Sequence, residues 1–262
     1  MAALQTDISA RSASRSFASE FVLSLKNLFL PALCHKCGER ILTEENLYFC
    51  ETCWATIDLV REPKCPRCGR PHPRRPGFEA PESFVCLECA EQKSWVERTH
   101  AAALHAGVLR DAIHLLKYRR KRLIAVPLSR LILETVFKEI DAAAYDAIIP
   151  VPLHRSRLRR RGYNQSDLIA RNLCAVLGAT HLPILKRVKD TASFSMLGAQ
   201  QRRNQIKDAF RTVPDANVKK KRLLLVDDVV TTGATTNECA RMLRKAGAQS
   251  VDVVSVAAAK ML

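Results

Sequence analysis

A chain of 262 residues, 47% of them hydrophobic, has the size of one large globular domain or two small ones. Its 42 Lys and Arg residues against 26 Asp and Glu residues give a net charge of +16, which favours anionic partners without choosing between nucleic acid, membrane surfaces and phosphorylated small molecules. No stretch approaches the roughly 20 apolar residues of a membrane-spanning helix. This excludes an integral membrane protein of the helical kind, and we expect a cytoplasmic protein.

The first 30 residues divide into a polar part and an apolar part. Residues 1–16 are rich in Ser, Ala and Arg, and we expect a disordered tail there. Phe17–Leu30 is mostly apolar, but Glu20 and Lys26 interrupt it, which favours a short amphipathic helix over a signal sequence. Pro31 would end that helix.

Eight of the ten cysteines form four Cys-x-x-Cys pairs. The pairs are Cys34/Cys37, Cys50/Cys53, Cys65/Cys68 and Cys86/Cys89. A Cys-x-x-Cys turn supplies two of the four thiolates that a tetrahedral zinc site needs. Disulfides are typical of secreted chains, and a redox dithiol would not occur four times. The spacing therefore predicts two zinc sites with four cysteine ligands each.

Two pairings of these cysteines remain open. Two consecutive ribbons would each use two neighbouring pairs, whereas a cross-brace would interleave them. The consecutive arrangement closes shorter loops, so it is favoured. Because four thiolates fill each tetrahedron, both sites should be structural rather than catalytic. Residues 17–93 would then form the helix and the double zinc ribbon, and a second domain would cover 94–262.

The second domain begins with two helical patterns. Ala101–Tyr118 carries apolar residues at helical spacing, and Leu123–Ile140 is a second helix-like stretch. Between them, Lys117–Arg122 is a dense basic run. It is either a solvated helix end or a surface that contacts phosphate.

A strand pattern at Asp146–Val151 leads into an arginine cluster. Its members are Arg155, Arg157, Arg159, Arg160 and Arg161. Guanidinium groups match phosphate oxygens, and ligands of α/β sheets bind beyond the carboxyl ends of the strands. Arg155, Arg161 and Lys117 are therefore candidate phosphate ligands. Ser166 would cap a helix that runs to Leu177.

Further strands are expected at Ile184–Val188 and Ser250–Ala257, and the polar stretch Thr191–Gln201 suits a mobile lid. Helical and strand patterns alternate from Ala101 onward. This alternation predicts an α/β fold with a mainly parallel sheet.

The strongest chemical pattern lies in Leu223–Thr235. Leu223–Val226 is an apolar run that fits a strand buried on both faces, and a helical stretch to Ala246 follows the pattern. The residues that carry the chemistry are Asp227, Asp228, Thr231, Thr232, Gly233, Ala234 and Thr235, with Ala234 as their small spacer.

These residue types suit a phosphorylated ribose. A helix N-terminus offers free N–H groups to a phosphate, glycine lets the backbone approach it, and threonine hydroxyls add donors. Paired carboxylates accept hydrogen bonds from sugar hydroxyls or bind a divalent cation. The alternative is an ordinary strand–loop–helix unit with a charged tip.

Leu223–Thr235 resembles the signature for phosphoribosyl pyrophosphate (PRPP) of type I phosphoribosyltransferases, and the chain from Phe21 to Leu262 resembles the ComF family. The residues that carry the family resemblance are the four Cys-x-x-Cys pairs, Leu116–Tyr118, Pro150–His154, Arg161–Gln165, Arg203, Asn204, Phe210 and Leu223–Thr235. In the lid, Phe194 and Gln201 stand where the family often has glutamine and arginine.

The resemblance implies a type I phosphoribosyltransferase-like domain, with helices on both faces of a mainly parallel sheet, after a small zinc-ribbon module. It also implies PRPP with Mg²⁺ as the ligand. Thr231–Thr235 would hold the 5′-phosphate, Asp227 and Asp228 would face the ribose hydroxyls, and Arg155 and nearby basic residues would hold the pyrophosphate.

Two functions follow from the resemblance and the charge. The first is transfer of phosphoribose to an acceptor. The alternative is a non-enzymatic factor in competence, DNA uptake or regulation, which uses the pocket as a nucleotide sensor and its basic surface for DNA. Single-stranded DNA or the DNA-uptake machinery would then be a partner.

Overall fold

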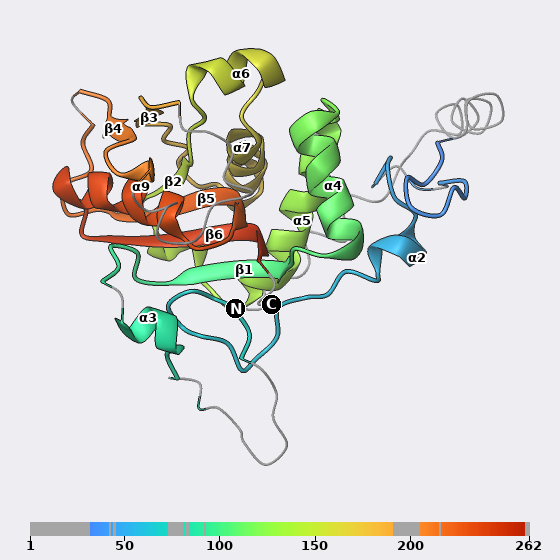
Figure 1. Ribbon diagram of the computed structural model, residues 1–262, viewed down its shortest axis with the longest axis horizontal. Helices are drawn as coiled ribbons and strands as arrows, with labels where there is room; N and C mark the ends of the chain where they lie inside the picture. The colour runs from blue at the N-terminus through green and yellow to red at the C-terminus, as the bar shows by residue number, and fades with distance from the viewer. Residues whose placement is uncertain are drawn as a thin grey trace. The chain divides into compact units, whose positions relative to one another are not determined.

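The computed structural model describes residues 32–41, 43, 46–72, 81, 84–91, 93–190, 205–214 and 216–259 (Figure 1). The chain divides into two compact units, Met1–Cys53 and Trp54–Leu262. The expected tail, the helix Phe17–Leu30 and the lid Thr191–Gln201 lie outside the described residues. Within the described part, no helix has the length and apolar character needed to cross a membrane.

A four-stranded parallel sheet forms the centre of the larger unit. Its strands, in spatial order, are β1 (Thr99–Leu104), β6 (Ser250–Ala258), β5 (Arg222–Val230) and β2 (Ala147–Pro150). The apolar stretches of β5 and β6 are buried throughout, as expected of strands covered on both faces. The predicted α/β fold is confirmed. Because all four strands run the same way, their carboxyl ends share one edge.

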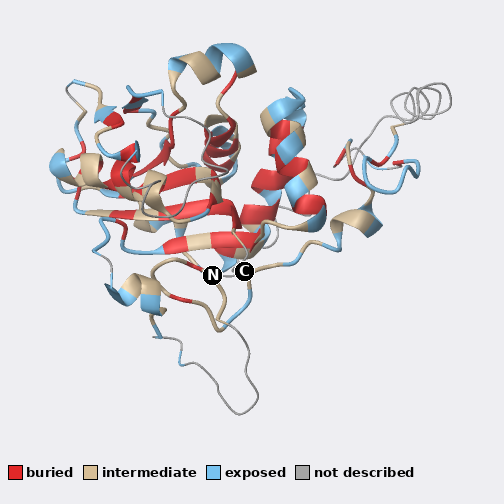
Figure 2. Cartoon of the chain, in the orientation of Figure 1, coloured by how far each residue is buried: buried red, intermediate tan, exposed pale blue. Residues whose placement is uncertain are grey.

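Helices cover both faces of this sheet. On one face, α9 (Ala234–Lys245) packs its apolar side against Leu223, Leu225 and Val251. On the other face lie α5 (Ala125–Thr135) and α7 (Gln165–Leu177). Figure 2 shows the resulting core, in which the strands and the inner sides of the helices are buried.

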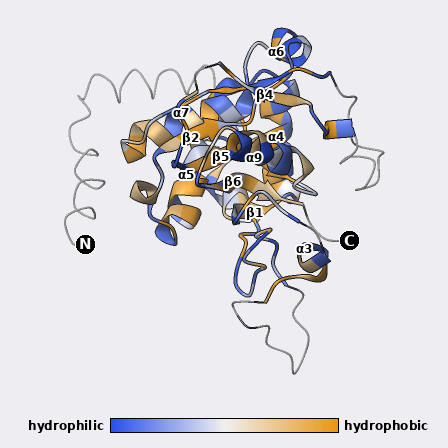
Figure 3. Cartoon of the chain, turned by 90° about the vertical axis from the view of Figure 1, so that its left-hand side faces the viewer, coloured by the Kyte–Doolittle hydropathy of each residue, from blue (hydrophilic) through white to orange (hydrophobic). Residues whose placement is uncertain are grey.

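The remaining elements are a further helix with a buried apolar side, α4 (Gly107–Tyr118), and several shorter elements. The shorter ones are α2 (Glu51–Trp54), α3 (Leu87–Glu91), α6 (Arg155–Arg161), the antiparallel pair β3 (Leu185–Arg187) and β4 (Phe210–Thr212), and the 3₁₀ turns η2 (Arg122–Ile124), η3 (Val136–Lys138) and η4 (Ala142–Ala144). In Figure 3, α6 stands out as a hydrophilic element.

The start of the second domain differs from the helical prediction. Ala101–Leu104 belongs to β1, and the helix begins only at Gly107. β1 pairs with β6 on one side and with residues 58–60 on the other, where Val60 N donates to the Ala102 carbonyl at 3.1 Å. These long-range pairings decide the conformation of an alanine-rich segment whose own preference is helical.

Two local boundaries also differ. The strand predicted at Leu223–Val226 continues to Val230, so both aspartates lie within β5. α7 begins at Gln165, and its N-cap is Asn164, whose Oδ1 accepts a hydrogen bond from Ser166 N at 3.2 Å. Ser166, the predicted cap, uses its hydroxyl for a different contact at the site described below.

Candidate functional site

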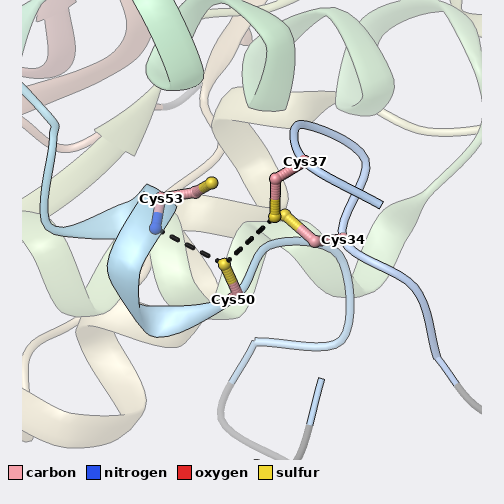
Figure 4. Close-up of side chains that lie close together, drawn as sticks. All are labelled: Cys34, Cys37, Cys50 and Cys53. Carbon is pink, nitrogen blue, oxygen red and sulfur yellow. Dashed lines mark hydrogen bonds between the residues drawn. The ribbon is translucent and has the colours of Figure 1, made fainter. Parts of the chain in front are cut away.

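The eight paired cysteines form two clusters. The sulfur atoms of Cys34, Cys37, Cys50 and Cys53 lie within 4.8 Å of one another, as do those of Cys65, Cys68, Cys86 and Cys89. Figure 4 shows the first cluster, in which one Cys-x-x-Cys turn faces the other. The cysteines therefore group consecutively, and the cross-brace alternative is wrong.

Both clusters have the chemistry of structural zinc sites. Burial opposes ionisation of the Cys34 thiol, but hydrogen bonds from backbone N–H groups outweigh it and lower its pKa to about 6. The same balance lowers the pKa of Cys65 to about 7. Burial and the neighbouring thiols raise the pKa of Cys37, Cys53, Cys68 and Cys89, so Cys34 and Cys65 are the ligands that ionise most readily without a metal. Thiolate is the form that zinc binds. Four sulfur ligands complete a tetrahedron, so neither site leaves a position for a substrate.

The threonine-rich loop joins β5 to α9. Thr231–Gly233 forms a bend, and Gly233 is the N-cap of α9 with a left-handed backbone (φ +70°). Gly233 has no side chain to cap the helix, and the Thr236 hydroxyl donates to the Gly233 carbonyl at 3.0 Å. The backbone N–H groups of the first turn therefore remain available to a ligand, which is the arrangement that binds phosphate at helix N-termini.

A cavity of about 40 Å³ lies against this loop, and we call it the loop cavity. It is lined by Ile206, Asp227, Val229, Val230 and the six residues from Thr231 to Thr236. The structure thus brings Asp227 together with Thr231, Thr232, Gly233, Ala234 and Thr235.

Asp227 is held by two donors and is hard to ionise. Its Oδ1 accepts hydrogen bonds from the Ser166 hydroxyl at 3.0 Å and from Asp228 N at 2.9 Å. Burial, together with the charge of Asp228, raises the pKa of Asp227 to about 7. A carboxyl group in this state gains from a ligand that brings hydroxyl donors or a divalent cation.

Asp228 lies on the other side of β5, because consecutive strand residues point to opposite faces. It is buried, and its Oδ2 lies 2.9 Å from Lys117 Nζ and accepts a hydrogen bond from Gln165 Nε2 at 3.1 Å. Arg161 is close to the same carboxylate: burial lowers the pKa of its guanidinium, and the charge of Asp228 partly offsets this effect. Asp228, Lys117 and Arg161 therefore form one charged cluster next to Asp227, although none of the three lines the loop cavity.

Arg155 lies in a different place. It is the exposed first residue of α6 and lines an open groove of about 570 Å³ together with His154 and Arg187. The structure does not place Arg155 among the residues that line the loop cavity.

Sequence reasoning missed several residues that the structure places at the site. Gln165 and Ser166 directly contact the two aspartates. Their position next to the Gly-Tyr-Asn motif was a usable signal. Ile206 had no such signal, because only the folding of the chain brings it to the loop cavity. Asp208 N donates to Glu238 Oε1 at 2.7 Å, and this bond holds the segment containing Ile206 against α9.

Comparison with known families agrees with this geometry. Residues 25–90 match the double zinc ribbon domain, and residues 168–261 match the phosphoribosyl transferase domain.

Three relatives show how far the similarity extends. The DNA utilization protein YhgH of Salmonella typhi is 34% identical over 232 residues, which cover 86% of this chain and 96% of the relative. Competence protein F of Haemophilus influenzae is 37% identical over 239 residues, which cover 87% and 90%. Competence protein ComFC of Streptococcus pneumoniae is 24% identical over 221 residues, which cover 82% and 90%. With both domains matched in order and near-complete relatives above 30% identity, this chain belongs to the ComF family, in which a double zinc ribbon precedes a phosphoribosyltransferase-like domain.

Proposed function

We propose that the protein binds PRPP or a closely related phosphoribosyl ligand. The observation that carries this proposal is the shared lining of the loop cavity, where a carboxyl group and an uncapped helix N-terminus meet. The N–H groups and hydroxyls of Thr231–Thr235 would hold the 5′-phosphate. Asp227 would accept hydrogen bonds from the ribose hydroxyls.

The charged cluster beside the cavity suits the rest of the ligand. Lys117 and Arg161 carry more positive charge than Asp228 neutralises, and a pyrophosphate would bind to that excess. Asp228 would remain the partner of Lys117 and would face the ribose at the end of β5, next to Asp227. Mg²⁺ would accompany PRPP, Asp227 would be the carboxyl group that holds it, and the ion would supply positive charge to offset that of the pyrophosphate.

The reaction class that fits is phosphoribosyl transfer. The bond between ribose C1 and the pyrophosphate oxygen breaks, and its electron pair leaves with pyrophosphate. A nitrogen of the acceptor then forms the new bond to C1 with its lone pair, and its proton is released to water. Asp227 and Asp228 would stabilise the positive charge that develops on the ribose, while Lys117 and Arg161 stabilise the leaving anion.

Thiolate ligands for zinc need a reducing environment, which supports a cytoplasmic location.

Incubation with PRPP, Mg²⁺ and a panel of nucleobases and amines tests this proposal. We expect pyrophosphate release that depends on one class of acceptor and falls below detection in Asp227→Asn. PRPP binding measured by calorimetry, with no turnover on any acceptor, would favour a sensor over an enzyme. Absence of PRPP binding to folded protein would remove the proposal.

A second candidate function is binding of single-stranded DNA, which fits the names of the relatives. The observation that favours it is a joined basic surface at the ends of α4 and α6. Arg120 Nη2 donates to the Arg160 carbonyl at 3.2 Å, and Arg161 lies over the ring of Tyr118 at 5.7 Å. Tyr118 is 60% exposed, and an exposed ring among cations is a stacking platform for bases.

We expect Tyr118→Ala to weaken binding of an oligothymidine at least fivefold, since stacking of one base contributes about 1–3 kcal/mol. Arg120→Ala should lower the slope of log affinity against log salt by about 0.7. Lys245→Ala, at the exposed end of α9, is the matched control and should change neither quantity. Fluorescence anisotropy over a salt series measures both. Equal effects of all three substitutions would count against a specific DNA surface.

A further inference from the structure

The second zinc ribbon belongs to the same compact unit as the sheet, and both of its ends are anchored there. Before the ribbon, residues 58–60 pair with β1, and Leu104 N donates to the Asp58 carbonyl at 2.8 Å. After the ribbon, Glu97 N donates to the Val251 carbonyl at 3.0 Å. The ribbon is thus built into the edge of the sheet.

The turn of the ribbon also touches the sheet directly. Gly69, which follows the knuckle cysteine Cys68, has a left-handed backbone (φ +69°). A Cβ atom at Gly69 would lie 2.2 Å from the carbonyl oxygen of Thr99 in β1. Only glycine can approach the Thr99 carbonyl this closely, so the Cys65–Cys68 turn packs directly against β1.

The ribbon and the threonine-rich loop together line one cavity of about 110 Å³, which we call the ribbon cavity. From the ribbon, its lining includes the zinc ligands Cys68 and Cys89 with Arg67, Arg70 and Glu88. From the loop and α9, it includes Thr231, Thr232, Gly233, Ala234 and Asn237. The same loop therefore lines both the loop cavity and the ribbon cavity.

One residue connects the exit of the ribbon to the start of α9. Asn237 Oδ1 accepts hydrogen bonds from Trp95 N at 2.7 Å and from the Ser94 hydroxyl at 3.2 Å. Asn237 N donates to the Gly233 carbonyl at 2.8 Å and so closes the first turn of α9. Asn237 thus connects Ser94 and Trp95, at the exit of the ribbon, by hydrogen bonds to the first turn of α9, which borders the loop cavity.

We propose that zinc binding at the second ribbon and phosphoribosyl-ligand binding at the Thr231–Thr235 loop are thermodynamically coupled through Asn237. This inference rests on the proposed function, because it needs a ligand at the loop. Zinc orders the ribbon, the ordered ribbon holds Ser94 and Trp95 on Asn237, and Asn237 holds the first turn of α9. By linkage, a ligand that orders this turn must tighten zinc binding by the same factor.

The coupling is specific to the second ribbon. The first cluster, Cys34 to Cys53, belongs to the other compact unit and serves as an internal comparison. A ligand at the loop should therefore slow zinc loss from one site and leave the other unchanged.

Transfer of zinc to a colorimetric chelator tests this inference on the full chain with Mg²⁺, with and without PRPP. We expect two release phases, of which PRPP slows one at least fivefold, within the usual range of such couplings. The slowed phase should disappear in Cys65→Ser and persist in Cys34→Ser.

Asn237→Leu tests the connecting residue without touching a zinc ligand. It removes the acceptor at similar volume, so PRPP should slow neither phase while the protein still binds two zinc ions. Asn172→Leu is the control: the amide of Asn172 bonds to Ser129 on the α5 side, and this variant should keep the PRPP effect.

The outcomes separate the inference from the function on which it rests. If calorimetry shows that PRPP binds, but PRPP changes neither rate of zinc release from the wild-type protein, the coupling is overturned and the proposed function stands. Slowing that survives intact in Asn237→Leu would overturn the role of Asn237. Absence of PRPP binding would remove both the function and the coupling.

Discussion

Asp227→Asn should lower PRPP affinity about tenfold or more and should also change how stability depends on pH. The affinity falls because a charge-assisted hydrogen bond to a ribose hydroxyl, worth about 1.5–3 kcal/mol, becomes a neutral one. Asparagine keeps the size of the side chain and an oxygen that can still accept from Ser166. The fold of β5 should therefore persist.

The pH effect has a definite sign. The folded-state pKa of Asp227 is about 7, above the ordinary aspartate value of about 3.9. Between these values the folded protein holds a proton that the unfolded chain has released. The free energy of unfolding therefore decreases as pH rises from about 4 to 7. An asparagine at this position cannot titrate, so the Asp227→Asn variant should lack this decrease and gain stability relative to wild type at pH 8.

Urea unfolding at pH 5 and pH 8, with calorimetry of PRPP and Mg²⁺ at pH 8, measures both effects. Each pKa unit corresponds to about 1.4 kcal/mol, so the stability difference between the two pH values should change by about 1 kcal/mol or more. Asp111→Asn, a charge change on α4, is the control and should behave as wild type. Unchanged affinity in a folded Asp227→Asn protein would separate Asp227 from the ligand site and support the charged-tip alternative.

Asp228→Asn should behave differently, because its partner is different. Asp228 is buried against Lys117, and removing its charge leaves that ammonium group without its carboxylate. We therefore expect Asp228→Asn to be less stable than wild type at pH 8, while Asp227→Asn is more stable. Opposite signs for two adjacent, chemically identical substitutions would be direct evidence that the two side chains face different surroundings.

Loss of zinc should have the largest effect on stability of any change considered. Elemental analysis of protein purified without chelator should give about two zinc ions per chain, one for each four-cysteine cluster. Cys65→Ser should reduce this to about one. Binding of structural zinc contributes about 10–16 kcal/mol in isolated zinc-finger peptides, so the affected ribbon should lose its fold.

The consequences of the two losses should differ between the two compact units. Without the second zinc, residues 58–60 and Trp95 should lose their protection from hydrogen exchange, since these flanks join the ribbon to β1 and α9. Without the first zinc, in Cys34→Ser, protection there should remain. Cys174→Ser, at a buried cysteine outside both clusters, should keep two zinc ions. A zinc content near zero in reduced, folded wild type would refute the zinc assignment.

Some features follow from local sequence, because their physics is local. A Cys-x-x-Cys turn prepares two ligands regardless of context, and closure of short loops favours consecutive pairing. The apolar run at Leu223–Val226 indicates a buried strand wherever it pairs. Gly233 after two threonines starts a helix whose N–H groups are free. The order of these local signals also predicts the parallel α/β fold and the family.

Tertiary pairing decided what local patterns could not. Ala101–Leu104 forms a strand because β6 and residues 58–60 pair with it, although alanine favours helix. β5 extends to Val230 because β6 continues beside it, and this extension sends Asp227 to the loop cavity and Asp228 to Lys117.

Tertiary structure also decided where Arg155 and the second zinc ribbon lie. Arg155 lies in the groove with Arg187, away from the residues of the loop cavity, because it begins α6 several residues after β2 ends at Pro150. The second ribbon joins the phosphate loop through Asn237, a contact across more than 140 residues of chain. Sequence by itself determined which chemical groups this protein has and which local turns present them. Only the folded chain decided which of them share a cavity, because strand pairing and burial act between segments far apart in the sequence.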